Sequence, residues 1–516
     1  MSRIGAADYE VGQDNIRILG LDIHNPVFLI SGVIIVAFVI CVLMFQEGSA
    51  AFFGALRPWL TSTLDWVFMI AGNVFVLFCL FLIVSSLGKV RIGGPDAKPD
   101  YSYAGWFAML FAAGMGIGLM FFGVLEPVFH FQNPPLGMSG EDPAAARSLG
   151  MAATIFHWGL HPWAIYAVVA LALALVCYNY GLPLSIRSAF YPVFGNAVWG
   201  WFGHVIDTLA VFATLFGLAT SLGFGAEQAS AGLDYLFGIP VTDVTKVLLI
   251  LGITAVALVS VLAGLDAGVK RLSEINMVLA FLLLMFVIAV GPTLDIVEGF
   301  FTGAVAYAVN LVPLSNWIGR EDTDFLHGWT TFYWAWWISW SPFVGMFIAR
   351  VSRGRTVREF VICVLIIPTI VSILWMNAFG GAAISQFVND GYTGVTETIA
   401  AWTPELSLFK MLEPLPMSGL LSFIGITLVI VFFVTSSDSG SLVIDTITAG
   451  GKIDAPVAQR IFWCTFEGLV AIALLLGGGL GSLQAAAIAT GFPFALVLLL
   501  MCVNVFKGLR AEQAKL

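Results

Sequence analysis

The chain has 516 residues, of which 59% are hydrophobic and only 10% are charged. A soluble globular protein has about 25% charged residues, so this composition excludes a soluble globule and predicts an integral membrane protein in a lipid bilayer. The formal net charge of −10 gives no reason to expect a nucleic-acid partner, because acidic residues gather in loops such as residues 321–324.

The cysteines stand singly within apolar runs, with no Cys-x-x-Cys pair and no nearby set of histidines. This spacing predicts neither a disulfide framework nor a metal site. The residues concerned are Cys41, Cys79, Cys177, Cys363, Cys464 and Cys502.

Polar residues 1–25 predict a cytoplasmic tail. No removable signal peptide is expected, because the next apolar run is full length and lacks a small-residue cleavage pattern. Apolar stretches of roughly 20 residues, the length that crosses about 30 Å of hydrocarbon, then predict an all-α protein with twelve membrane spans. We place the spans at residues 26–46, 65–88, 104–124, 162–180, 204–224, 244–264, 273–291, 329–350, 359–379, 418–444, 460–478 and 483–506.

The distribution of basic residues predicts the orientation. If both termini are cytoplasmic, 17 of the 22 Lys and Arg residues face the inside, which is the asymmetry that the positive-inside rule expects. Long connections at about 125–160, 292–328 and 380–417 then fall outside, and the last of these is expected to hold a surface helix. The apolar segment 297–313 has charged flanks and favours an interfacial helix. Residues 507–516 form a short cytoplasmic tail.

The third span carries alternate glycines, Gly114, Gly116 and Gly118, within an apolar run. Each glycine costs a helix about 1 kcal/mol relative to alanine. The sequence therefore permits local unwinding, which exposes backbone carbonyls to substrate and ions in secondary transporters. Close packing of small residues between helices explains the same glycines equally well. A dinucleotide-binding loop is excluded because no strand precedes them.

Trp158, Trp163 and Tyr166 flank the predicted start of the fourth span. Taken alone, they are ordinary interface residues. His157 and His161 straddle the same helix start without a carboxylate spaced as in a zinc helix, so we expect no metal site there.

The eighth span is the most informative segment, because residues 333–347 within it hold four tryptophans at membrane depth. At about 100° per residue, six aromatic rings share an arc of roughly 120°, and Trp334 falls outside it. An aromatic wall attracts a quaternary ammonium or sulfonium group, which has no N–H to donate. The pattern predicts a binding site for a methylated onium compound, formed by Tyr333, Trp336, Trp337, Trp340, Phe343 and Phe347.

The tenth span ends in a cluster of hydroxyl side chains that includes Thr435, Ser436 and Ser437. Hard oxygen donors suit a small hard cation, so the cluster is a candidate Na⁺ site. Hydrogen bonding of these hydroxyls to their own helix is the alternative, and it is the commoner case for an isolated cluster.

Isolated ionisable residues support less specific predictions. Asp438 lies near the inner membrane face, where a structural partnership with basic loop residues is favoured over a functional role. Glu467 lies deeper in the eleventh span and is a candidate for proton handling. Glu126, His130 and Asp207 fall near predicted span ends, where we expect loop or capping groups.

Four stretches together resemble the betaine/choline/carnitine transporter (BCCT) family. They are residues 114–121 (GMGIGLMF), 158–166 (WGLHPWAIY), 332–337 (FYWAWW) and 435–436. The resemblance covers nearly the whole chain, and its most specific part is the tryptophan-rich span followed by residues 349–358.

The resemblance implies a particular architecture. Two peripheral helices within residues 26–100 precede two inverted five-helix repeats of the LeuT type, at 101–291 and 329–506, and the external loop 292–328 lies between the repeats. The family also implies a homotrimer.

The resemblance implies a substrate site made of two aromatic groups and the unwound part of the third span. The central cage would consist of Trp336, Trp337, Trp340 and Phe347. The aromatic box on the inward route would consist of Trp158, Trp163, Tyr166 and Trp337. The unwound backbone would be that of Ala113, Gly114, Gly116 and Gly118.

The resemblance also implies sodium as the coupling ion, with no other cofactor. The ligands would be the carbonyls of Ala112, Met115 and Phe432 and the hydroxyls of Thr435 and Ser436. A second sodium site in betaine symporters of the family uses two threonines one turn apart and an aromatic ring. Thr214 and Phe343 match that pattern, but Leu218 stands where the other threonine is expected, so the number of ions stays open.

Two features sort the substrate and the coupling. Proton-coupled choline transporters of the family often carry Asp at the position of Gly118, so glycine points to a zwitterion. Residues 339–342 (SWSP), which sodium-independent exchangers replace, are kept. The resemblance therefore implies no enzyme, but Na⁺-coupled uptake of glycine betaine, or secondly dimethylsulfoniopropionate, across a bacterial inner membrane. Proton-coupled choline or carnitine transport and precursor/product exchange are the alternatives.

Overall fold

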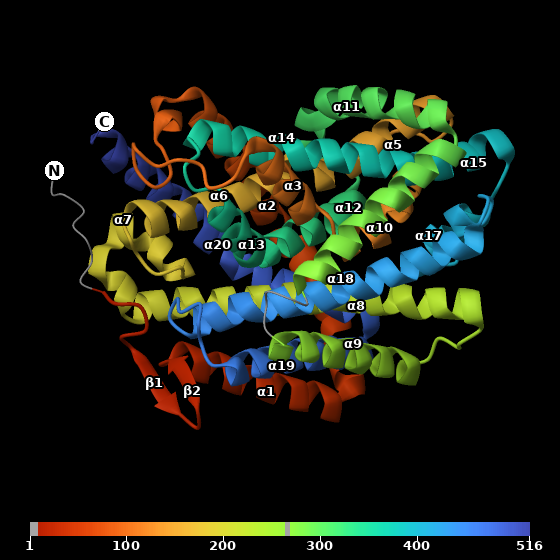
Figure 1. Ribbon diagram of the computed structural model, residues 1–516. Coiled ribbons are helices and arrows are strands. Elements are labelled where there is room, and N and C mark those ends of the chain that lie inside the picture. The colour runs from red at the N-terminus through yellow and green to blue at the C-terminus, as the bar shows by residue number, and fades with distance from the viewer. Residues whose placement is uncertain (1–8, 264–268, 516) are drawn as a thin grey trace.

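The computed structural model describes residues 9–263 and 269–515, and most of them lie in helices (Figure 1). In the part before residue 264, a hairpin of β1 (Asn15–Ile18) and β2 (Leu21–His24) pairs Asn15 with His24. The helices there are α1 (Val27–Met44), α2 (Gln46–Val84), α3 (Tyr103–Gly114), α4 (Ile117–Gln132), α5 (Pro143–Trp158), α6 (Leu160–Ala174), α7 (Tyr191–Phe194), α8 (Trp201–Phe237) and α9 (Asp243–Ala263), with short helical turns η1 (Ser86–Lys89), η2 (Leu175–Asn179), η3 (Ile186–Phe190) and η4 (Gly195–Trp199).

The part after residue 268 is helical as well. Its helices are α10 (Val269–Val290), α11 (Thr293–Ser315), α12 (Thr323–Phe325), α13 (Thr331–Val351), α14 (Val357–Met376), α15 (Ala382–Asp390), α16 (Gly394–Ala400), α17 (Ser407–Leu412), α18 (Ser418–Thr448), α19 (Val457–Leu476) and α20 (Gly479–Gln513), with turns η5 (Leu326–Thr330), η6 (Asn377–Gly381) and η7 (Pro404–Leu406).

Local sequence signals explain where several helices begin and end. The Ser102 hydroxyl accepts a hydrogen bond from the N–H of Gly105 at the start of α3, and Asp142 caps α5 ahead of Pro143. α14 starts with a reciprocal capping box between Thr356 and Glu359. These caps satisfy backbone groups that the helices themselves leave without partners.

Among the described residues, eleven helices are long and apolar enough to cross a membrane, or twelve if the bent pair α3 and α4 forms one span. Large apolar side chains such as Val33, Val259, Phe281 and Val309 are exposed on outer helix faces, which is what contact with hydrocarbon requires. The predicted all-α membrane class is confirmed, and the number twelve agrees.

The set of helices differs from the predicted spans. α11, which contains the expected interfacial segment, is long and apolar enough to cross a membrane. α13, which forms most of the predicted eighth span, is not among the helices that are. Tryptophan, tyrosine, serine and proline lower the mean hydropathy of α13. Most of its side chains are buried against other helices, so α13 does not need an apolar surface of its own. The interfacial placement of α11 stays a prediction.

The predicted connection at 125–160 has the wrong bounds, and the helical content expected at 380–417 is present but divided. Residues 125–132 continue α4 and residues 143–158 form α5, so the expected connection at 125–160 shrinks to residues 133–142. Residues 380–417 hold the short helices α15, α16 and α17 instead of a single surface helix. Both differences arise because polar residues inside protein-enclosed helices look like loop residues in a hydropathy pattern.

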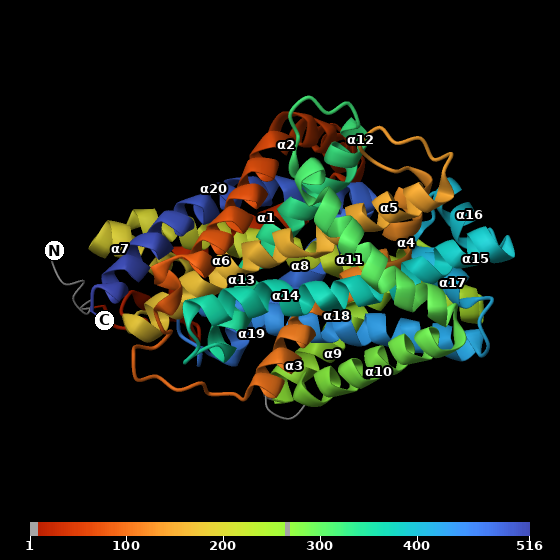
Figure 2. The same cartoon turned by 90° about the horizontal axis from the view of Figure 1, so that it is seen from above.

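The aromatic helix α13 lies in the centre of the bundle. It packs against α6, α8 and α20, and the side chains of Tyr333, Trp334 and Trp336 are fully buried. Figure 2 shows α13 within the bundle, near α6 and α8. The rings therefore face protein and not lipid.

The hairpin and the end of α20 lie at the same end of the bundle, on the left of Figure 1, as an even number of crossings requires. The Asp22 carboxylate accepts hydrogen bonds from Lys452 at 2.5 Å and from Asn15 at 3.0 Å. Burial opposes ionisation of Asp22, but these donors outweigh it, so its pKa lies below the usual value.

Asp207 is a buried partner rather than a loop group. Its carboxylate pairs with the Arg187 guanidinium at 3.2 Å and accepts a hydrogen bond from the Arg187 backbone N–H at 2.9 Å, so the capping part of the prediction is correct and the loop part is wrong.

Burial beside the Arg187 cation lowers the pKa of His24 to about 3.

Candidate substrate and ion sites

The predicted break in the third span is present. α3 ends at Gly114, α4 begins at Ile117, and their axes differ by 66°. Gly116 between them is extended, and a Cβ added there would meet no atom within 4 Å. This segment therefore offers open space next to a backbone that has left its helix.

The aromatic rings crowd around the same segment. A Cβ on Gly114 would lie 3.3 Å from the Trp163 ring, and a Cβ on Gly118 would lie 2.8 Å from Trp158 and 3.1 Å from Trp336. The sequence left two explanations of these glycines open. Unwinding applies to Gly116, and close packing applies to Gly114 and Gly118.

The four box residues come together from α5, α6 and α13. Trp158 meets Trp337 edge-on with ring centroids 4.9 Å apart, Tyr166 lies 6.3 Å from Trp337, and Trp163 lies 5.3 Å from Tyr166. All four side chains are buried. The arrangement gives an aromatic lining beside the open position at Gly116, and its role in binding stays a prediction.

The expected central cage is less complete than the box. Trp336 lies parallel to both Phe332 and Trp337, with centroids 5.4 and 4.8 Å away. Because rings at 4.8 Å touch each other, a trimethylammonium group has no room between Trp336 and Trp337. That the cage of Trp336, Trp337, Trp340 and Phe347 binds the substrate stays a prediction.

The other two cage residues lie further along α13. The Trp340 indole donates to the carbonyl of Gly217 at 2.9 Å and meets Phe343 at 5.1 Å. Phe347 is 36% exposed and forms no ring pair within the described residues. The structure therefore groups Trp337 with the α5 and α6 rings and leaves Trp340 and Phe347 apart from them.

The candidate sodium ligands lie on two elements. On α18, the Thr435 hydroxyl donates to the carbonyls of Val431 at 3.0 Å and Phe432 at 3.2 Å, so the back-bonding alternative is observed. A hydroxyl that donates keeps its oxygen lone pairs for a cation. The half-buried Ser436 forms no side-chain hydrogen bond within the described residues.

The other half of that candidate site is the break itself. The Met115 N–H donates to the Ala112 carbonyl at 3.3 Å, and one lone pair of that oxygen stays available. Ala113 lies in the last turn of α3 and is half-buried. α18 contacts α4, the helix that begins after this break, and a shared Na⁺ site formed by these carbonyl and hydroxyl oxygens stays a prediction.

The second candidate sodium site is less complete. The buried Thr214 hydroxyl donates to the Ala210 carbonyl at 2.7 Å. Leu218, one turn later, packs so closely on α18 that a Cβ on Gly440 would lie 2.3 Å from it. An apolar side chain thus fills the place where a second hydroxyl would be needed.

Sequence reasoning missed a buried polar cluster around Glu126. Its carboxylate contacts His157 at 2.6 Å, the Trp158 indole at 2.7 Å and the Tyr333 hydroxyl at 2.5 Å. Glu126 and His130 are buried, so their assignment as loop or capping groups is wrong. The rule that an intramembrane carboxylate is a functional suspect would have found Glu126, had the third span not been ended at residue 124.

The two histidines near the fourth span have different partners. His161 contacts Asn73 at 3.0 Å, whereas the nearest ionisable neighbours of His157 are Glu126 and His130. Ligand-type atoms of these last three residues lie within 4.8 Å of one another. The sequence missed this grouping because His130 and His157 come from different helices.

Two further carboxylates are buried near α18. Asp438 accepts a hydrogen bond from Ser260 at 2.8 Å, and Glu467 accepts one from Ser437 at 3.1 Å. Among the described residues, the hydrogen-bond partner of Asp438 is thus a hydroxyl and not a basic loop residue.

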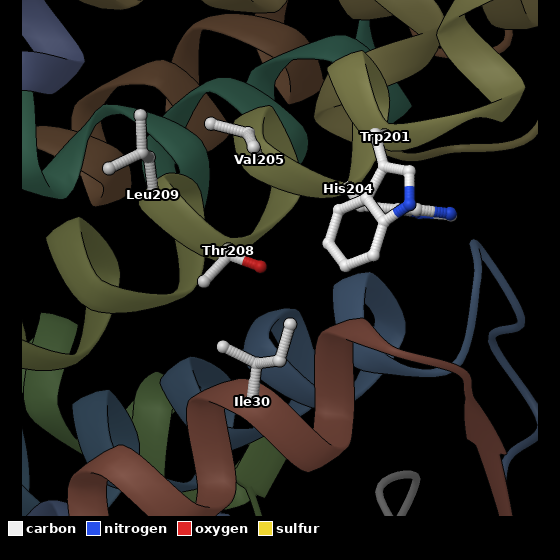
Figure 3. A pocket seen from close by; sticks show the side chains of 6 residues that line it. All are labelled: Ile30, Trp201, His204, Val205, Thr208 and Leu209. Carbon is white, nitrogen blue, oxygen red and sulfur yellow. The ribbon is translucent and has the colours of Figure 1, made fainter.

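A cavity of about 140 Å³ between α1 and α8 is lined mostly by apolar side chains (Figure 3). Ile30 of α1 lies opposite Val205 and Leu209 of α8. Leu209 lies more than two helical turns before Gly217, the residue that contacts Trp340. None of the residues that line the cavity belongs to the aromatic box.

The broken helix, the buried rings and the many apolar helices together define a membrane transporter. The profile of the BCCT, betaine/carnitine/choline family transporter matches residues 26–514, and the chain belongs to this family. It is a multi-pass membrane transporter of betaine-type compounds and not an enzyme.

Curated relatives are similar over nearly the whole chain. A glycine betaine/proline/choline transporter of Vibrio parahaemolyticus is 62% identical, over 98% of this chain and 94% of the relative. Glycine betaine transporter 1 of the same organism is 54% identical, over 99% and 98%. A glycine betaine transporter of Acinetobacter baylyi is 44% identical, over 95% of this chain and 74% of the relative.

Proposed function

We propose that this protein is a Na⁺-coupled symporter that takes up a zwitterionic quaternary ammonium or sulfonium osmolyte, glycine betaine first and dimethylsulfoniopropionate second. The observation that carries the proposal is the buried aromatic lining of Trp158, Trp163, Tyr166 and Trp337 beside the open position at Gly116. Three similar relatives are named for glycine betaine transport.

The chemistry of the lining fits such a substrate. A methylated onium group cannot donate a hydrogen bond, so ring faces are its best partners. The unwound segment presents backbone N–H groups, which suit the carboxylate of a betaine. A substrate that carries both charges would use both surfaces at once.

Sodium would bind between the two parts of the proposed site, the break after α3 and the helix α18. The carbonyls of Ala112, Met115 and Phe432 and the hydroxyls of Thr435 and Ser436 are the proposed ligands. An ion held between the break and α18 would draw these elements together and close the substrate site, and the inverted repeats of a LeuT-type fold would then alternate its access. Thr214 and Phe343 are proposed for a second ion only if Leu218 can move away.

A second candidate function is transport of choline or carnitine coupled to protons, or exchange of precursor and product. One relative is named for proline and choline as well as glycine betaine. The buried carboxylates Glu467 and Asp438 would be the groups that carry a proton.

We further propose that the protein lies in a bacterial inner membrane as a homotrimer, with both termini cytoplasmic. Bacterial relatives and the excess of basic residues in the predicted inner loops support this placement.

Uptake by proteoliposomes tests the function. Radiolabelled glycine betaine is expected to accumulate when an inward Na⁺ gradient is imposed at constant pH, and not with K⁺ in place of Na⁺. Accumulation driven by a pH gradient without Na⁺ would favour the proton-coupled alternative and overturn the Na⁺ assignment.

A further inference from the structure

One carboxylate connects the two walls of the aromatic site. Glu126 of α4 accepts hydrogen bonds from the indole of Trp158 on α5 and the hydroxyl of Tyr333 on α13. Trp158 and Tyr333 both contact Trp337, with centroids 4.9 and 5.7 Å away. The carboxylate lies behind the rings that the substrate would face.

The contacts of Glu126 involve both of its oxygens. Oε2 accepts from Trp158 and Tyr333, and Oε1 contacts Nδ1 of His157 at 2.6 Å and Nε2 of His130 at 3.5 Å. The side chain is fully buried. A buried group with this many partners fixes the orientation of each of them, because any movement leaves a polar atom without a partner.

A negative charge behind an aromatic ring also changes what the ring attracts. Hydrogen bonds from an indole N–H or a phenol O–H to a carboxylate push electron density into the ring. The ring face becomes more negative, and its attraction for a cation becomes stronger. The charge itself attracts a cation through the low-dielectric interior and repels an anion.

We propose that Glu126 is a positioning residue of the substrate site whose charge also strengthens the binding of a cationic head group. This inference rests on the proposed function. Glycine betaine carries a carboxylate that partly cancels the effect of Glu126, whereas choline carries no negative group. The Glu126 charge therefore supports choline more than it supports glycine betaine.

Glu126→Gln separates the charge from the geometry. The amide oxygen can accept from Trp158 and Tyr333, and the amide nitrogen can donate to Nδ1 of His157 if Nε2 of that ring donates to Thr330, 2.9 Å away. The same partners are kept, the bond to His157 is reversed with a change of its tautomer, and the negative charge is lost.

The experiment measures how choline and glycine betaine each inhibit uptake of radiolabelled glycine betaine in proteoliposomes. In Glu126→Gln, the inhibition constant is expected to rise about tenfold for choline and only about two- to threefold for glycine betaine. The exposed Glu298 of α11 provides the matched control, and Glu298→Gln should leave both constants unchanged.

Tyr333→Phe provides a second variant if Glu126→Gln does not fold. It keeps the ring and removes one donor to Glu126, so the ratio of the two constants should move in the same direction by about twofold. Equal shifts for both ligands in the variants would overturn the inference, because a purely structural role weakens both alike. Wild-type protein that takes up no glycine betaine would instead overturn the proposed function.

Discussion

The aromatic region and the proposed ion-binding region of this transporter are built in different ways. The rings of α5, α6 and α13 are joined to one another and to Glu126 by direct contacts. The proposed sodium ligands on α3 and α18 are instead hydrogen-bonded within their own elements, as Thr435 and Met115 are. The protein itself thus preorganises the aromatic lining, whereas the proposed ion donors would need a bound cation to bring them together.

The largest effect is expected from removal of a ring that belongs to the preorganised region. Trp337→Ala should raise the KM for glycine betaine at least about tenfold, because a cation–π contact at a desolvated site contributes about 2 kcal/mol or more. Uptake kinetics at saturating Na⁺ measure this change. Trp201→Ala on the exposed start of α8 is the control, and equal losses in both variants would contradict a specific role for Trp337.

A pair of glycine variants tests the close approach of the rings to the break. A methyl group on Gly118 would lie 2.8 Å from Trp158, whereas one on Gly116 would meet nothing within 4 Å. Gly118→Ala should therefore reduce uptake several-fold, because its methyl group overpacks against the Trp158 ring. Gly116→Ala should reduce uptake less, because its methyl group enters the open space of the proposed site without a clash. The reverse order would show that the transport-active conformation differs at this break.

A threonine pair on α18 tests the ion region. Thr435→Ala should raise the Na⁺ concentration for half-maximal uptake about fivefold, the loss of one neutral oxygen ligand at about 1 kcal/mol. Thr427 has the same bond to its own helix, with Phe423 at 2.8 Å, and is the matched control. Titration of uptake with Na⁺ checks both variants, and an unchanged Na⁺ response in Thr435→Ala would remove this residue from the site.

The smallest effect is expected at the N-terminal hairpin, which belongs to neither region. Asp22 has a lowered pKa, so its contribution to stability is complete above the usual aspartate pKa of about 4 and is lost as the pH falls through its folded value. Asp22→Asn should lower the unfolding temperature slightly at pH 7, and the difference from wild type should shrink below about pH 4. A difference that stays constant with pH would contradict the role of the charged form.

The sequence could predict the features that depend on residue type and period. The aromatic face of α13 follows from spacing alone, and the family follows from the motifs. The alternate glycines permit the break between Gly114 and Ile117, but they fit close helix packing equally well. The sequence could not predict that Trp336 stacks on Trp337, because that depends on how neighbouring helices press on α13. It also could not find the Glu126 cluster, whose members come from α4, α5 and α13 and have no common spacing.

The most direct test of the account measures glycine betaine binding to the purified transporter by calorimetry, in Na⁺ and in K⁺. The aromatic lining should bind glycine betaine in Na⁺, and the affinity should fall at least about tenfold in K⁺, the weakening expected when about 1.4 kcal/mol of coupling is lost. Equal affinity in the two salts, or no binding in either, would contradict the claim that an ion joins the break to α18 and closes the site around an onium group.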